Sequence, residues 1–157
     1  MKARDIMTRH PSVVTPSDTL DRAAQLMKDR HIGMLPVVDD LLGRHLQGIL
    51  TDRDIVTRCV ATGHDPASLV RDHMTSHDLG WVAMDDDVTE VVTKMNQHHI
   101  RRIPVLADGG RLAGVIALAD LATRLEPGME RRRPDAGIAR KVSPKSRTES
   151  AKTSPQS

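Results

Sequence analysis

A hydroxyl and a carboxylate stand three residues apart in the stretch GILTDRD, Gly48 to Asp54, directly after a short apolar run. Thr51 can accept from the backbone N–H of Asp54 in a capping box that opens a helix. A helix N-terminus also offers free N–H groups and a positive dipole end to a phosphate, and a carboxylate beside it can accept from both hydroxyls of a ribose. The stretch therefore fits either a helix cap or a nucleotide contact.

The stretch recurs later in the chain, together with the segments that precede it. RDIMT at 4–8 reappears as RDHMT at 71–75, HIGMLPVV at 31–38 as HIRRIPVL at 99–106, and GILTDRD as GVIALAD at 114–120. The offsets lie between 66 and 68 residues, a spread that loop insertions of one or two residues produce. The chain thus carries two copies of one supersecondary unit.

Each copy predicts the element order β-α-β-β-α. Short extended segments at 12–15 and 81–84 precede helices with apolar residues at positions i, i+3, i+4 and i+7, and strands and a shorter helix follow. The expected core stripes are Leu20, Ala23, Ala24 and Met27 in the first copy and Val88, Val91, Val92 and Met95 in the second. We assign these positions to packing.

These paired units resemble a tandem of cystathionine β-synthase (CBS) domains, a Bateman module, of the small stand-alone bacterial type. The resemblance rests on the RDIMT lead-in, the HIGMLPVVD and HHIRRIPVL strands and the GILTDRD ending. It implies an α/β (α+β) fold in which two repeats pack sheet to sheet about a pseudo-twofold axis. We expect repeats at 1–59 and 71–125, a linker at 60–70 and a disordered basic tail at 126–157.

The resemblance also implies a non-enzymatic regulatory module that requires no cofactor. Similar proteins bind AMP, ATP or S-adenosylmethionine in clefts between the repeats, form homodimers, and signal by changing the arrangement of the dimer or of a partner. On the family pattern Gly-x-x-Thr-x-x-Asp, Thr51 and Asp54 serve the first cleft and Arg53 contacts phosphate. The remaining candidate contacts to the base are Val14, Thr15, Ile32, Gly33, Met34, Pro36, Val82 and Ile103.

The second copy departs from this pattern. Ala117 replaces the threonine while Asp120 is kept, so Asp120 has either a ligand contact or only a helix-dipole role. Arg101 and Arg102 could supply charge to that second cleft, whereas Gly33 and Met34 leave the first less charged. We therefore expect the two clefts to be occupied unequally.

Composition narrows the function classes. Trp81 is the only aromatic residue, which excludes a nucleic-acid platform built from stacked aromatic rings. A single cysteine, Cys59, and the lack of an apolar run of roughly 20 residues lead us to expect a cytoplasmic protein without a membrane segment. Residues 126–157 carry eight Lys or Arg and four Asp or Glu, so a contact between this tail and nucleic acid is one alternative.

Metal binding and catalysis are two further functions that the sequence can be searched for. His73 and His77 have a spacing that suits a metal on a helix face, but solvated histidines are the favoured interpretation because no cysteine pair accompanies them. No nucleophile elbow, Walker loop or zinc-protease motif is present, so we do not expect an enzyme. A ligand-independent, stress-associated protein that acts by dimerising or docking is the main alternative to a nucleotide sensor.

Overall fold

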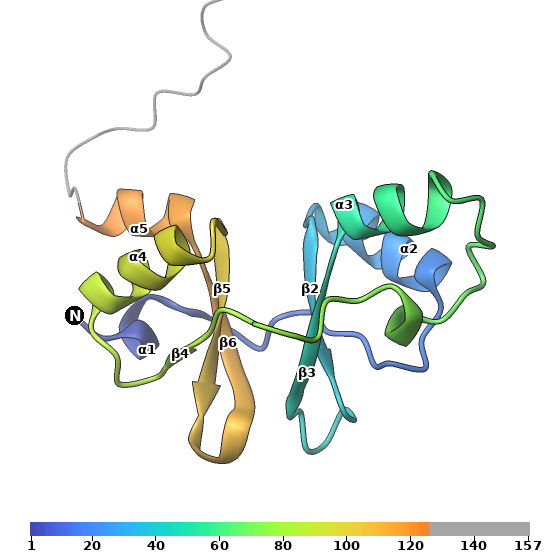
Figure 1. The fold of residues 1–157 in the computed structure, drawn as a ribbon. Helices are drawn as coiled ribbons and strands as arrows, with labels where there is room; N and C mark the ends of the chain where they lie inside the picture. Colours follow the sequence, from blue (N-terminus) through green and yellow to red (C-terminus); the bar gives the residue numbers. More distant parts are fainter. Residues whose placement is uncertain (126–157) are drawn as a thin grey trace, which may run out of the picture. The chain divides into compact units, whose positions relative to one another are not determined.

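Two β-hairpins stand side by side at the centre of the fold, and helices cover the outer side of each (Figure 1). The computed structural model describes residues 1–125. The first hairpin pairs β2 (Met34–Val38) with β3 (Leu46–Thr51), and the second pairs β5 (Arg102–Ala107) with β6 (Arg111–Ala117). Both pairs are antiparallel, and a bridge between His45 and Arg111 joins the two hairpins near their turns.

The helices follow the predicted order. α2 (Leu20–Arg30) precedes the first hairpin, and α3 (Asp52–Asp54) follows it and continues into a π-helical stretch, Ile55–Val60. α4 (Val88–Gln97) and α5 (Leu118–Leu125) occupy the equivalent places in the second copy. The buried stripe positions are Leu20, Ala23 and Met27 on α2 and Val91 and Met95 on α4. The predicted mixed α/β fold of two repeats is confirmed.

Asp87 caps the N-terminus of α4. Its carboxylate accepts from the backbone N–H of Thr89 at 3.2 Å, and this hydrogen bond holds the pKa of Asp87 below its usual value. A lowered pKa means that the cap stabilises the fold above the carboxyl's unfolded pKa. The contribution is lost as the pH falls through the folded pKa.

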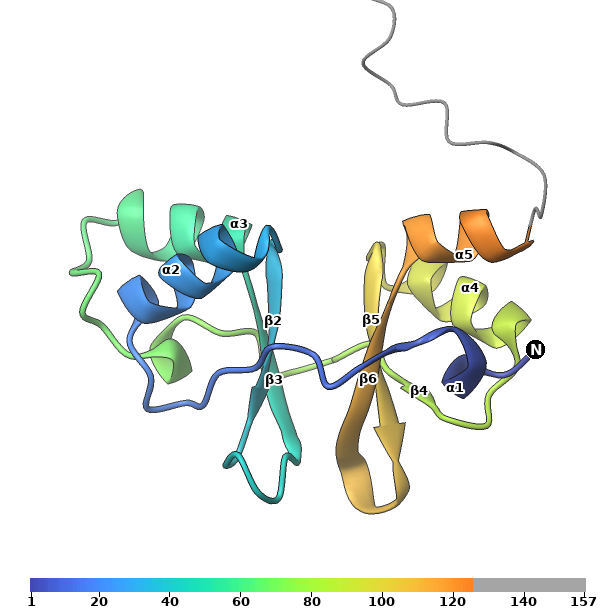
Figure 2. The same cartoon turned by 180° about the vertical axis from the view of Figure 1, so that it is seen from behind.

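The segment at the start of each repeat, here called its lead-in, packs on the hairpin of the other repeat. α1 (Ala3–Ile6) and β1 (Thr8–Arg9) come first in the chain, yet β1 pairs with β6, giving the sheet order β1-β6-β5-β4 with β4 at Val82–Ala83. The second lead-in, a 3₁₀ turn at Val70–Asp72 followed by Thr75, bridges to Ile49 of β3. Figures 1 and 2 show both connections crossing between the halves.

The two main cores follow this exchange. Ala3, Ile6 and Met7 pack with residues of the second copy, and Val70 and Met74 pack with residues of the first. A third, smaller cluster lies between the hairpins and is formed by Val38, Leu106 and Leu112 with Val13 and Leu46 against it. Neither repeat can complete its core from its own sequence alone, because each borrows apolar side chains from the other's lead-in.

Two glycines allow the lead-ins to lie against the hairpins. A Cβ at Gly114 would stand 2.7 Å from the carbonyl oxygen of Thr8 and 2.8 Å from Sδ of Met7. A Cβ at Gly48 would stand 2.7 Å from the carbonyl oxygen of Thr75 and 2.9 Å from Sδ of Met74. The first residue of each GILTDRD-type stretch is thus glycine because a backbone strand crosses directly over it.

The expected boundaries at 1–59, 60–70 and 71–125 describe the repeats along the sequence and remain predictions. In space, the lead-in of each repeat packs on the other repeat. The predicted disordered tail, 126–157, lies outside the described residues. Within residues 1–125, no helix combines the length and the apolar character needed to cross a bilayer.

Replacing Gly114 with alanine is expected to destabilise the fold by about 1–3 kcal/mol, because the added methyl overlaps backbone that cannot move aside. Gly48→Ala should cost a similar amount, since its surroundings are equivalent. The measurement is urea unfolding, with exposed Gln47→Ala on the same strand as the control. Unchanged stability in both glycine variants would contradict the close packing of the lead-ins.

Candidate functional site

A cavity of about 360 Å³, here called the Asp120 cavity, opens between the two hairpins. Three parts of the chain form it: the lead-in after β1, the end of α2 with β2, and β5, β6 and α5 of the second copy. The lining residues are Thr8, His10, Pro11, Ser12, Arg30, Ile32, Met34, Pro36, Arg102, Val115, Ala117 and Asp120. Its wall combines an apolar surface with two guanidinium groups and one carboxylate.

A second cavity of about 430 Å³, here called the Thr51 cavity, lies at the end of β3. It too draws on both copies. The lining residues are Gly33, Met34, Ile49, Thr51, Asp52, Ile100, Arg101 and Arg102. Met34, at the start of β2, and Arg102, at the start of β5, line both cavities.

The carboxylate of Asp54 is already engaged within the protein. Its Oδ2 accepts from the backbone N–H of Thr51 at 3.0 Å, and the Thr51 hydroxyl accepts from the backbone N–H of Asp54 at 3.1 Å. Asp54 also lies 3.7 Å from Nε of Arg58, and its side chain is 14% exposed. Asp54 lines neither cavity, so the structure shows the first copy's pair acting as a helix cap.

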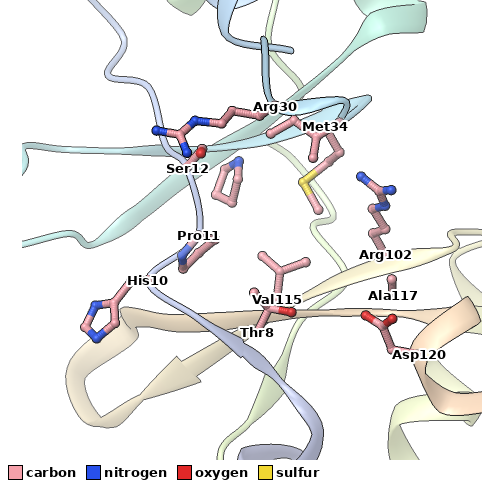
Figure 3. Close-up of a pocket in the computed structure, with 12 residues that line it drawn as sticks. Thr8, His10, Pro11, Ser12, Arg30, Met34, Arg102, Val115, Ala117 and Asp120 are labelled. Carbon is pink, nitrogen blue, oxygen red and sulfur yellow. The ribbon is translucent and has the colours of Figure 1, made fainter. Parts of the chain in front are cut away.

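Asp120 is in the opposite situation. Ala117 provides no hydroxyl, and among residues 1–125 no side chain pairs with the Asp120 carboxylate. Figure 3 shows this carboxylate beside Ala117 and below Arg102, at the wall of the cavity, with Met34 and Arg30 across from it. The second copy, which has Ala117 in place of the threonine, is thus the one whose carboxylate is available to contact a ligand.

The expected distribution of charge between the clefts differs from the structure at Arg101, whereas Arg102 does line the Asp120 cavity. Arg101 lines the Thr51 cavity, with Gly33 and Met34, and Arg102 lines both cavities. The reason is that each cavity is built from both copies, so a residue of one repeat faces the terminal motif of the other. The Thr51 cavity is therefore the one with two adjacent arginines, and the Asp120 cavity receives Arg30 from the first copy.

Several predicted base contacts lie away from both cavities. Val14, Val82 and Ile103 are at most 1% exposed and belong to the two main cores, so they cannot touch a ligand in this structure. Thr15 lines neither cavity, and its backbone N–H donates to Asp18. Arg53 is exposed and likewise lines neither cavity. Ile32, Gly33, Met34 and Pro36 do line one cavity or both.

Sequence reasoning missed the contribution of the lead-in and of α2. Thr8, His10, Pro11 and Ser12 reach the Asp120 cavity only because β1 is added to β6. Arg30 ends α2, two residues before Ile32, and this closeness in sequence was the one signal that could have identified it. No local pattern indicates the position of the lead-in, because it depends on the exchange between the two halves.

The prediction that His73 is solvated is wrong. His73 is 3% exposed, with Nδ1 3.1 Å from the carbonyl oxygen of Leu69 and Nε2 3.1 Å from Nδ1 of His64. A carbonyl oxygen only accepts, so Nδ1 of His73 donates to Leu69. Within residues 1–125 no group of three or more His, Cys, Asp or Glu side chains is arranged to hold a metal ion.

Comparison with protein families matches residues 3–61 and 70–127 to the CBS domain. The chain belongs to the CBS-domain family. CBS-domain proteins are regulatory, and the two matched segments correspond to the two repeats of this chain. The exchanged lead-ins and the two cavities thus lie within a chain that contains two CBS domains.

Relatives of similar length match most of the chain. Hypoxic response protein 1 of Mycobacterium tuberculosis is 37% identical over 123 residues, which are 78% of this chain and 84% of that protein. CBS domain-containing protein YhcV of Bacillus subtilis is 38% identical over 119 residues, 76% of this chain and 81% of the relative.

Solved structures show the same fold. A crystal structure of Hypoxic Response Protein I with two coordinated zinc ions superposes with a TM-score of 0.73 at 35% identity and covers 80% of this chain and 100% of that one. A CBS domain protein of Pyrobaculum aerophilum complexed with AMP has a TM-score of 0.70 at 23% identity and covers 77% and 90%. The second likeness concerns the fold alone.

Thr51→Ala is expected to lower the free energy of unfolding by about 1 kcal/mol, because it removes the capping hydroxyl and leaves the N–H of Asp54 without its acceptor. Thr57→Ala, at an exposed position later in the same helical segment, is the matched control and should change stability by less than about 0.5 kcal/mol. Chemical denaturation measures both. Equal effects of the two substitutions would show that Thr51 is not the cap.

Proposed function

We propose that the protein is a regulatory sensor that binds AMP, or a related adenosine phosphate, in the Asp120 cavity. The observation that carries the proposal is the unengaged carboxylate of Asp120 at the wall of a largely apolar cavity that also contains two arginines. The Asp120 carboxylate has no protein partner, so it can accept hydrogen bonds from ligand hydroxyls. The arginines are not neutralised by Asp120, so they can bind a negatively charged group at the other end of the same ligand.

Each part of the ligand has a matching wall. The Asp120 carboxylate can accept hydrogen bonds from both ribose hydroxyls. Arg30 and Arg102 can each offer a planar fork of donors to a phosphate. The base would lie among the aliphatic side chains of Ile32, Met34 and Val115, since no Phe, Tyr or Trp ring lines the cavity.

Size and charge narrow the ligand class. A volume of about 360 Å³ lies near the lower end of the 300–1,000 Å³ typical of small-molecule sites, which suits a nucleoside monophosphate better than a triphosphate. The sulfonium cation of S-adenosylmethionine would face Arg30 and Arg102, and like charges repel. We therefore place AMP ahead of ATP and S-adenosylmethionine.

We expect weaker binding at the Thr51 cavity. Its arginines could hold a phosphate, but the first copy's ribose-type acid, Asp54, is held by Thr51 and does not line the cavity. The carboxylate of Asp52 faces Gly33 so closely that a Cβ there would stand 2.9 Å from its oxygen. A ligand would have to break the cap or move Asp52, and either step costs binding free energy.

The proposal is tested by a thermal-shift titration with AMP, ADP, ATP, adenosine and S-adenosylmethionine. AMP at 100 times its dissociation constant should stabilise the wild type by about 2.7 kcal/mol. Asp120→Asn and Arg30→Gln should weaken AMP binding about 10-fold to 100-fold, because each removes a charged hydrogen-bonding partner. Arg101→Gln is the matched control, since this arginine lines only the Thr51 cavity.

Two results would overturn the assignment. Weakening by Arg101→Gln but not by Arg30→Gln would move the ligand to the Thr51 cavity. A folded wild type that none of the compounds stabilises would instead favour the ligand-independent interaction protein. The proposed contact between the tail and nucleic acid lies outside the described residues and is not needed by either account.

A homodimer would give the sensor its output. Apolar side chains are exposed on the helices that follow each hairpin, Val56 and Val60 in the π-helical stretch and Leu118 and Leu125 on α5. Figure 1 shows both helices on the same side of the hairpins. A second copy covering these side chains would link ligand binding to dimer arrangement, provided that AMP binds the two arrangements with different affinity.

Val60→Glu is expected to raise the dimer dissociation constant at least tenfold, because it places a charge in an apolar interface. Leu42→Glu is the control, since Leu42 is 90% exposed, the highest value for a large apolar side chain in residues 1–125, but lies in a turn at the other end of the hairpin. Sedimentation equilibrium measures both constants. A wild type that remains monomeric at 100 μM, a concentration on the order of 100-fold above a micromolar constant, would contradict the proposed dimer.

A further inference from the structure

A third cavity, of about 250 Å³, lies near the turns of the two hairpins, away from Asp120. Its lining includes three arginines and one histidine, namely Arg9, His10, Arg44 and Arg111, and no carboxylate. The rest of the lining is apolar, with Met7, Met84, Leu112 and Ala113. We call it the arginine cavity.

The cations come from three separate segments. Arg9 ends β1, His10 follows it, Arg44 lies in the turn between β2 and β3, and Arg111 begins β6. His10 and Arg44 both have left-handed backbone, with φ of 51° and 54°. The exchange of the lead-in is therefore what brings Arg9 and His10 to the two hairpin turns.

Main-chain oxygens hold two of the guanidinium groups in place. Nη2 of Arg44 donates to the carbonyl oxygen of Pro11 at 3.1 Å, and Nε of Arg111 donates to the carbonyl oxygen of Gly43 at 3.2 Å. The backbone N–H of Leu112 donates to the carbonyl oxygen of Arg44 at 2.8 Å. These bonds orient the side chains but bring no negative charge to them.

Among the described residues, no carboxylate lies within 4 Å of the charged nitrogens of the three arginines. Ion pairs within 4 Å occupy Arg4, Arg22 and Arg58 elsewhere in residues 1–125, but none involves Arg9, Arg44 or Arg111. Nε of Arg44 is moreover buried and has no hydrogen-bond partner. Arg44 is half-buried, whereas Arg9 and Arg111 are exposed. A half-buried guanidinium group without a counter-charge is costly, and an anion beside Arg44 would offset that cost.

We propose that the arginine cavity binds a phosphate-class oxyanion. Three guanidinium groups present planar forks of donors that match phosphate oxygens, and their charge exceeds what a single carboxylate would neutralise. The volume is below the range of sites for drug-sized ligands, so the anion is a compact one such as phosphate or pyrophosphate. The anion is either a free ion or the phosphate end of a larger molecule. The second source is possible because His10 lines both this cavity and the Asp120 cavity.

The test is calorimetric titration of the full chain with sodium pyrophosphate in a chloride buffer, without nucleotide. Arg9→Gln should weaken binding at least tenfold, and this side chain makes no hydrogen bond or ion pair within residues 1–125 whose loss could unfold the protein. Arg44→Asn should do the same, because asparagine tolerates the left-handed backbone while removing the guanidinium group.

Two controls separate this site from other cations. Arg71→Gln removes an exposed arginine that lines none of the three cavities, and substitution of Arg131, Arg132 and Arg133 by glutamine removes the basic cluster of the tail. Neither should weaken pyrophosphate binding more than about twofold. If the tail variant loses binding while Arg9→Gln retains it, or if the wild type gives no heat at millimolar pyrophosphate, the proposal is overturned.

The titration is independent of the proposed AMP site. Asp120→Asn should bind pyrophosphate as the wild type does, so loss of AMP binding alone leaves the arginine cavity intact. Competition identifies the source of the anion. If AMP or ATP displaces pyrophosphate in the wild type but not in Asp120→Asn, the phosphate belongs to a ligand that spans both cavities, and additive binding indicates a free ion.

Discussion

The structure depends on two places where a backbone crosses directly over a glycine. At Gly48 and Gly114 the lead-in of the other repeat passes so close that no Cβ fits, and this contact adds β1 to β6 and Thr75 to β3. Because each core then contains apolar side chains from the other repeat's lead-in, the two halves stabilise each other. The cavities between the hairpins are a consequence, since every one of them is lined by both copies.

One difference between the copies makes the cavities chemically unequal. Thr51 and Asp54 satisfy each other's hydrogen bonds, so the first acid is used for local stability. Ala117 cannot do the same for Asp120, which is left facing the cavity. A substitution that looks like the loss of a binding motif in the sequence therefore frees the group that a ribose would contact.

The order of the elements could be predicted from the sequence because it depends on local patterns. These are the apolar spacing on α2 and α4, the turn residues, and a motif that occurs twice. The exchange of lead-ins could not, because RDIMT and RDHMT are nearly the same and neither indicates which hairpin it joins. The sequence also could not show that Val82 and Ile103 belong to a core. An apolar residue on a strand gives the same sequence pattern whether it faces a core or a cleft. Arg30 and His10 approach Asp120 only through tertiary packing.

A crystal structure of the full chain with AMP tests the central claim most directly, because it shows whether the Asp120 cavity or the Thr51 cavity holds the nucleotide. The account predicts one AMP per chain, with its ribose hydroxyls on the Asp120 carboxylate, its phosphate toward Arg30 and Arg102, and the bonds between Thr51 and Asp54 intact. A nucleotide bound at Thr51 with Asp54 released from its cap, while the Asp120 cavity stays empty, would contradict it.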